Sequence, residues 1–109
     1  MKYKQGDIIS IPFYDGKNWK QRPAIIISND DLQQDEEIIY VVMISSKEYN
    51  EQYSYKLTQE MYTGQLHKQS YVKCHLIEFN QPESNTIKIG TIKPKFLKEI
   101  IEKIKQSIF

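Results

Sequence analysis

The hydrophobic pattern of this chain changes its period once, close to Pro94. Before that point, apolar residues form short runs rich in β-branched side chains and separated by polar turns, as in strands. After it, apolar residues recur every three or four positions, which predicts an amphipathic helix over about residues 93–107. The predicted strands cover residues 8–13, 24–28, 37–45, 53–57, 70–77 and 86–92. We therefore expect a mainly β protein with one C-terminal helix, in which a small, strongly curved sheet is closed by that helix.

Three local signals refine this expectation. Residues 24–28 and 37–45 are almost continuously apolar, so both faces of these two strands should be covered. Between them, Asn29 is expected to cap a short helical turn that runs through Leu32. Residues 61–67, around Gly64, are expected to form a turn.

Length and composition limit the classes of function. At 109 residues, the chain should form a single domain over residues 1–109. Its longest apolar runs are too short to span a membrane, and no apolar signal core follows Met1, so a cytoplasmic location is expected. Cys74 alone cannot form an internal disulfide, and two histidines without nearby acidic residues at ligand spacing predict neither a metal site nor a cofactor. With a net charge of +1, nucleic-acid binding would require a local cluster of cations.

The segment that ends at Arg22 carries the strongest functional signal. The chain reads Gly6-Asp7-Ile8, then a polar loop over residues 15–21, then Arg22-Pro23-Ala24 and Ile27-Ser28-Asn29. Proline belongs at a strand start or edge, which places Arg22 at the rim of a strand. These elements, at this spacing, resemble the MazF/PemK family of toxin ribonucleases from bacterial toxin–antitoxin pairs. The resemblance covers essentially the whole chain and is strongest over residues 6–29.

The resemblance implies a fold, an activity and partners. The fold is the SH3-like barrel shared by the MazF, Kid and CcdB toxins. The implied activity is sequence-selective, metal-independent cleavage of single-stranded RNA by a type II toxin. In that reaction the ribose 2′-hydroxyl attacks the adjacent phosphate and leaves a 2′,3′-cyclic phosphate and a 5′-hydroxyl end. The implied partners are a cognate antitoxin, which would block the RNA groove, and a second copy of the chain in a homodimer.

The same resemblance assigns candidate catalytic residues. Arg22 would bind the scissile phosphate through its planar fork of donors, and the alternative for it is a surface ion pair. Ser45 occupies the position of the family's threonine, within Met43-Ile44-Ser45-Ser46, and the alternative for it is a strand-end turn hydroxyl. His75 could transfer protons near neutral pH, or it could be a structural residue on a half-buried strand. His67 is interpreted as structural.

Several residues are candidates for RNA binding. The loop Lys17-Asn18-Trp19-Lys20-Gln21 places the lone tryptophan between cations, which suits stacked bases and a phosphate backbone. Trp19 could instead fold back onto the core or be buried by a second subunit. Alternation along residues 70–75 sends Lys73 and His75 to one face of the strand, where some relatives carry an arginine and an aspartate. The remaining candidates are Ser46, Ser70 and Lys73.

One departure from the family pattern leaves alternative functions open. Glu78 stands where many relatives have a basic residue, and its carboxylate would repel phosphate if it faced the groove. A non-catalytic RNA- or protein-binding module on the same fold is therefore the second reading. A third is a gyrase inhibitor like CcdB, which the Arg22-Pro23 element disfavours.

Overall fold

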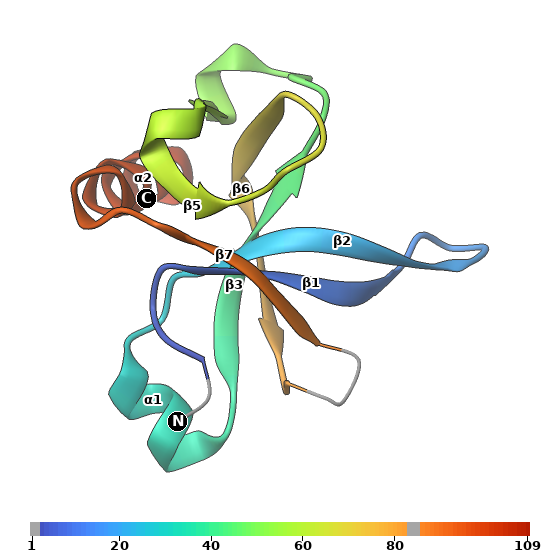
Figure 1. The fold of residues 1–109 in the computed structure, drawn as a ribbon, viewed down its shortest axis with the longest axis vertical. Helices are drawn as coiled ribbons and strands as arrows, with labels where there is room; N and C mark the ends of the chain where they lie inside the picture. Colours follow the sequence, from blue (N-terminus) through green and yellow to red (C-terminus); the bar gives the residue numbers. More distant parts are fainter. Residues whose placement is uncertain (1–2, 83–85) are drawn as a thin grey trace.

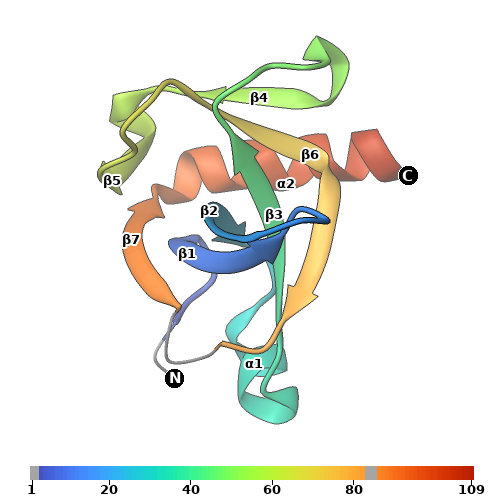
Figure 2. The same cartoon turned by 90° about the vertical axis from the view of Figure 1, so that its right-hand side faces the viewer.

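The strands form one curled antiparallel sheet, crossed by a C-terminal helix (Figures 1 and 2). This computed structural model describes residues 3–82 and 86–109. The seven strands follow the order β4-β6-β3-β2-β1-β7-β5. They are β1 (Asp7–Tyr14), β2 (Trp19–Ile26), β3 (Ile39–Ser45), β4 (Ser54–Leu57), β5 (Tyr62–Gly64), β6 (Ser70–Asn80) and β7 (Ile87–Ile92). The helices are α1 (Asp30–Glu36) and α2 (Pro94–Ile108), and short 3-10 turns cover Glu51–Tyr53 and Gln59–Met61. The predicted mainly β architecture with a C-terminal helix is confirmed.

The central strands are covered on both faces, as their apolar runs predicted. Ile8, Ile25 and Val42 are register partners on β1, β2 and β3, and they are buried with Ile100 and Ile104 of α2. The opposite face carries a second buried cluster of Tyr3, Ile9, Ile11, Ala24, Ile26, Ile39, Val41 and Met43. Because side chains alternate along a strand, one apolar run supplies both clusters. This double burial gives the site described below a rigid support.

The helix boundaries follow from local capping. The Asn29 side chain accepts a hydrogen bond of 2.9 Å from the Leu32 amide, which confirms the predicted cap. The helix continues to Glu36, beyond the predicted end at Leu32, and stops at Glu37, whose φ of 58° is left-handed. In α2, Lys93 is the N-cap and Pro94 opens the first turn, where a missing amide hydrogen costs nothing.

The second strand begins earlier than the apolar pattern predicted. Only residues 15–18 form the hairpin loop, because Trp19, Lys20 and Gln21 already pair with β1. These residues are exposed, so their pairing leaves no apolar signal in the sequence. Pro23 consequently lies inside β2 rather than at its start. It is tolerated because β3 pairs with β2 only from Ala24 onward, so residues 19–23 have β1 as their single strand neighbour.

The predicted turn at residues 61–67 is partly wrong, because residues 62–64 form β5 and pair with β7. Gly64 lies opposite Gly90 in this pairing. A Cβ atom built on Gly64 would overlap the Ile89 carbonyl, and one built on Gly90 would overlap the Thr63 carbonyl. Two facing glycines therefore allow β5 to close against β7 at a separation that no side chain permits.

Replacing Gly90 with alanine should lower the free energy of unfolding by roughly 1–3 kcal/mol, the usual cost of overpacking. The added methyl group would push β5 away from β7. Denaturant unfolding of the variant and the wild type would measure the loss, and the dependence of the free energy of unfolding on denaturant concentration should be unchanged. Gly16→Asn is a matched control, because Gly16 is left-handed but has open space around it, and asparagine tolerates that conformation. Wild-type stability in the Gly90→Ala variant would contradict the close approach of the two strands.

Candidate active site

Arg22 and Ser45 lie where β2 and β3 separate. The last register pair joins Ala24 to Met43, and extending the same register by two residues places Arg22 opposite Ser45. There the strands no longer pair, and two cavities of about 410 and 450 Å³ open beside them. Arg22, Ile44 and Ser45 line both cavities, so together they form a shared wall. The structure thus brings together the two residues that the sequence singled out for catalysis.

The two cavities differ in chemistry. The first contains a cation, an imidazole, a carboxylate and a phenol beside the shared wall, from Lys73, His75, Glu78 and Tyr49. The second is lined by amides, hydroxyls and further basic groups, from Gln21, Ser46, Gln65, His67, Lys68 and Ser70. Both therefore offer polar partners to a ligand that crosses the wall.

Within the residues that the structure describes, the Arg22 guanidinium is not held in an ion pair. The residue is half-buried within β2, and among residues 3–82 and 86–109 no carboxylate forms a salt bridge with it. The surface ion pair given as the alternative for Arg22 is therefore not seen among these residues. A planar guanidinium on a strand supported by two buried clusters can donate two parallel hydrogen bonds to a phosphate.

The Ser45 hydroxyl is oriented by the turn that follows β3. Its oxygen accepts a hydrogen bond of 3.1 Å from the Lys47 amide. A hydroxyl has one donor and two acceptor sites, so this contact leaves the Ser45 proton free to donate to a ligand. The turn hydroxyl anticipated as an alternative is therefore present, and it is compatible with catalysis. Serine lacks the methyl group that restricts the rotamer of threonine, but the hydrogen bond from the Lys47 amide restricts the rotamer of Ser45 here.

Lys73 is buried, contrary to simple alternation along β6. Val72, Lys73 and Cys74 are all buried in succession, because β6 bulges against β3. Met43 pairs with Lys73, while the neighbouring Val42 pairs with Ile77. Lys73 and His75 nevertheless both line the first cavity.

The first cavity also places His75 and Glu78 near the shared wall. β6 is half-buried, as expected, and His75 lies on its exposed part, with its ring 5.0 Å from that of Tyr53. Glu78 lines the same cavity, so the acidic side chain does face the groove. His67 is exposed in the second cavity rather than packed inside the protein. Both imidazoles are therefore accessible to a ligand.

The second cavity collects the other polar candidates. Gln21 donates a hydrogen bond of 3.1 Å from Nε2 to the Ser10 hydroxyl, and Ser70 donates one of 2.9 Å to the Lys68 carbonyl. Ser46 is exposed beside them. Sequence reasoning missed Tyr49, Gln65 and Lys68 as cavity residues. Tyr49 follows β3, and Gln65 and Lys68 follow β5, in polar segments with no distinguishing signal.

The remaining RNA-binding candidates, Lys17, Asn18, Trp19 and Lys20, line neither cavity. They lie at or beside the tip of the hairpin between β1 and β2, which projects from the rest of the molecule (Figure 1). The side chain of Asp15 organises this tip by accepting hydrogen bonds from the amides of Asn18 and Lys17, at 2.8 and 2.9 Å. These amides, and then the Lys20 ammonium at 3.3 Å, lower the pKa of Asp15 to about 2.

The lone tryptophan does not fold back onto the core. Trp19 is 70% exposed, and its ring lies 5.3 Å from that of Tyr14, its register partner across the hairpin. The two rings form a small aromatic surface on the projecting arm. Base stacking and contact with a second subunit both remain consistent with this placement.

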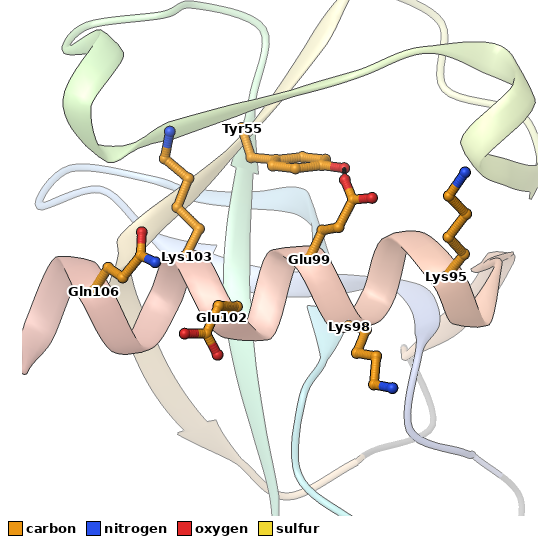
Figure 3. Close-up of a pocket in the computed structure, with 7 residues that line it drawn as sticks. All are labelled: Tyr55, Lys95, Lys98, Glu99, Glu102, Lys103 and Gln106. Atoms are coloured by element: carbon orange, nitrogen blue, oxygen red, sulfur yellow. Dashed lines mark hydrogen bonds between the residues drawn. The ribbon is translucent and has the colours of Figure 1, made fainter.

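A third hollow, of about 880 Å³, lies between β4 and α2 and contains none of the predicted site residues. In Figure 3, Tyr55 extends over the helix, and its hydroxyl donates a hydrogen bond of 2.7 Å to Glu99. Burial, and then this contact, raise the pKa of the Tyr55 phenol. Three lysines and two glutamates line this hollow, so its surface carries charges of both signs. We assign it a structural role in tying β4 to α2.

Two further classes of site were searched for over residues 3–82 and 86–109. Within that part of the chain, no three histidine, cysteine, aspartate or glutamate side chains gather as metal ligands would. No helix in the same residues has the length and apolar character needed to cross a membrane.

Known structures share this fold. The MazE–MazF complex from Deinococcus radiodurans aligns with a TM-score of 0.78 at 12% identity, covering 96% of this chain and 94% of that one. An endoribonuclease bound to its cognate antitoxin, from a mycobacterial species, aligns at 0.75 with 14% identity and coverages of 96% and 93%. The Mycobacterium tuberculosis toxin MazF-mt6 aligns at 0.70 with 18% identity and coverages of 92% and 94%. At these identities the likeness establishes the fold.

Sequence comparison assigns the family. A search of curated proteins gives no significant match. The family model described as "PemK-like, MazF-like toxin of type II toxin-antitoxin system" matches residues 4–108. That span includes Arg22, Ser45 and every residue that lines the two cavities. The chain therefore belongs to the family of PemK-like and MazF-like toxins of type II toxin–antitoxin systems.

Proposed function

We propose that this protein is an endoribonuclease that cleaves single-stranded RNA as the toxin of a type II pair. The observation that carries the proposal is the shared wall between two polar cavities. It presents an oriented hydroxyl and a guanidinium that forms no ion pair with any described residue. A phosphate at Arg22 would have nucleotides on both sides, one in each cavity. Cleavage at such a phosphate is internal to the RNA.

The chemistry requires no nucleophile from the protein. The ribose 2′-oxygen attacks the adjacent phosphorus, the bond from phosphorus to the 5′-oxygen breaks, and a 2′,3′-cyclic phosphate and a 5′-hydroxyl result. Arg22 would neutralise charge on the phosphoryl oxygens, and the free Ser45 proton would donate to one of them. His75 is accessible in the first cavity and has the right chemistry to take or give a proton. Glu78 would exclude phosphate from its end of that cavity and leave room there for a base.

The partners of this chain are part of the proposal. Solved neighbours include a complex of MazE with MazF and an endoribonuclease bound to its cognate antitoxin. By analogy, we expect a cognate antitoxin to cover the two cavities and prevent RNA binding. We also expect a homodimer, to which the exposed Tyr14–Trp19 surface could contribute, and a cytoplasmic location.

Purified protein should cleave a long single-stranded RNA at a limited set of sites in the presence of EDTA. Gel analysis and end labelling should show 5′-hydroxyl ends beside cyclic phosphates. DNA should survive because it lacks the 2′-hydroxyl, and duplex RNA should survive because its 2′-hydroxyl cannot align with the phosphorus. Intact RNA at high protein concentration, with binding still measurable, would favour the non-catalytic binding module instead.

A further inference from the structure

The buried ammonium of Lys73 is attached to the turn that carries Ser45. Lys73 is 3% exposed, and its Nζ donates to the Ser54 hydroxyl at 3.2 Å and to the Lys47 carbonyl at 3.5 Å. The ring of Tyr49 covers the same ammonium, with its centroid 4.9 Å away. Lys47 and Tyr49 belong to the connection between β3 and β4, and Ser54 is the first residue of β4. One side chain of β6 therefore contacts this connection at two points and the start of β4 at a third.

The Lys47 peptide links this cation to the candidate catalytic hydroxyl. Its carbonyl accepts the hydrogen bond from Lys73, and its amide donates the one that orients Ser45. Ser54 extends the network, because its hydroxyl donates in turn to the Asn50 carbonyl at 2.8 Å. Displacing the Lys73 ammonium would thus free the peptide that fixes the Ser45 rotamer.

Burying the Lys73 ammonium costs solvation free energy, which its partners must offset. A buried cation normally pairs with an anion. Among residues 3–82 and 86–109, no carboxylate forms a salt bridge with Lys73. Its partners are instead two oxygens and an aromatic face, in the connection between β3 and β4 and at the start of β4. An ammonium has three donors, so these three contacts engage it with protein groups even though Lys73 lines the first cavity.

We propose that Lys73 is a positioning residue that acts on RNA cleavage through Ser45 and does not bind RNA phosphate. This inference rests on the proposed function, and it replaces the direct RNA contact expected from the sequence. Lys73 donates a hydrogen bond to the Lys47 carbonyl, and the Lys47 amide donates one to the Ser45 oxygen. The Ser45 proton can then donate to the phosphate. The expected consequence is a loss of rate without a loss of affinity.

Lys73→Met tests this, because methionine keeps much of the length of the side chain and removes its charge and its donors. The kcat for RNA cleavage should fall by roughly tenfold to a hundredfold, the scale expected for a misplaced catalytic group, while KM should change by less than about twofold. Ser54→Ala keeps the cation and removes one of its acceptors, so it should lower kcat in the same direction. Lys56→Met is the matched control, because Lys56 is an exposed lysine of β4 that lines none of the cavities described.

Two readouts separate positioning from RNA contact. When Ser45 is already alanine, Lys73→Met should lower kcat by less than about a further twofold, because its effect passes through Ser45. The slope of log affinity against log salt should equal that of the wild type, whereas a lost phosphate contact would reduce it by about 0.7. Additive losses of rate, or a reduced salt slope, would overturn the proposal.

A structural readout keeps this test independent of the enzymatic assignment. Hydrogen exchange at the Lys47 amide should be faster in Lys73→Met than in the wild type. The reason is that Lys73 fixes the Lys47 peptide, and the fixed peptide keeps the amide hydrogen-bonded to Ser45. Unchanged exchange at Lys47 would overturn the positioning role. Failure of the wild-type protein to cleave any RNA would overturn the proposed function instead, and the salt slope and the exchange rate would still decide the role of Lys73.

Discussion

Replacing Arg22 with lysine is expected to slow RNA cleavage by roughly a hundredfold to a thousandfold, the effect of losing one transition-state donor. Lysine keeps the positive charge but replaces a planar fork with a single point donor. The charge on the phosphoryl oxygens has to be met more strongly in the transition state than in bound RNA, so geometry matters more for rate than for affinity. Arg22→Ala should be at least as slow. Single-turnover cleavage of a defined RNA would measure both variants.

Affinity and stability should respond much less to these changes. Other cations would still hold the RNA backbone, so binding should weaken only modestly and should keep falling with log salt at about −0.7 per phosphate neutralised. Arg22 is half-buried on a segment of β2 with a single strand neighbour, outside both buried clusters, so unfolding should be nearly unchanged. Lys56→Ala provides a control for the loss of an exposed cation. A lysine variant with wild-type turnover would show that Arg22 supplies charge alone. A fully active alanine variant that unfolds several degrees lower would make the residue structural and remove the main support for a nuclease.

Replacing Ser45 with alanine should raise the barrier to cleavage by about 2–4 kcal/mol, the range for one oxyanion donor. The loss should appear in kcat and in kcat/KM together, because the hydrogen bond to the phosphoryl oxygen strengthens only in the transition state. Ser45→Thr should retain activity, since threonine offers the same hydroxyl to the Lys47 amide and to the phosphate. The measurement is the cleavage rate at saturating and at limiting RNA.

Ser46→Ala is the comparison that identifies the hydroxyl. Ser46 is exposed and lines the second cavity alone, whereas Ser45 lines both. Full activity in Ser45→Ala together with a severe loss in Ser46→Ala would mean that the neighbouring hydroxyl is the donor. A severe loss in neither variant would leave Arg22 without a hydroxyl partner from this turn.

The strands and the terminal helix could be predicted because burial follows hydrophobic period. The run over residues 37–45 predicted a strand covered on both faces, and β3 is such a strand. The prediction failed where pairing occurs without burial, as at Trp19, which joins β2 through its register with Tyr14 while staying exposed. Strand β5 was missed for another reason, because its pairing depends on two facing glycines that are distant in sequence, Gly64 and Gly90.

The sequence predicted the parts of the candidate site that lie in short, recognisable sequence motifs. Arg22-Pro23 and the segment around Ser45 suggested two catalytic residues, and the structure places both on one wall. The surroundings of Lys73 could not be predicted, because they depend on how residues 47–54 fold over a bulged strand. The separation of the hairpin tip from the cavities could not be predicted either, because Gln21, which lines the second cavity, continues the same polar stretch as residues 15–20.

The bulge in β6 divides one strand into two independent ladders. Residues 39–42 of β3 pair with residues 77–80, and residues 43–45 pair with residues 71–73, so residues 74–76 have no register partner on β3. Cys74 is fully buried in the cluster that contains Ile8, Ile25 and Val42, whereas His75 and Leu76 are exposed, so these two can be replaced without shifting any strand pair. His75 and Leu76, which line the first cavity, belong to this insert. The ligand preference of the first cavity could therefore be altered by replacing His75 and Leu76, with the pairing of β6 to β3 unchanged.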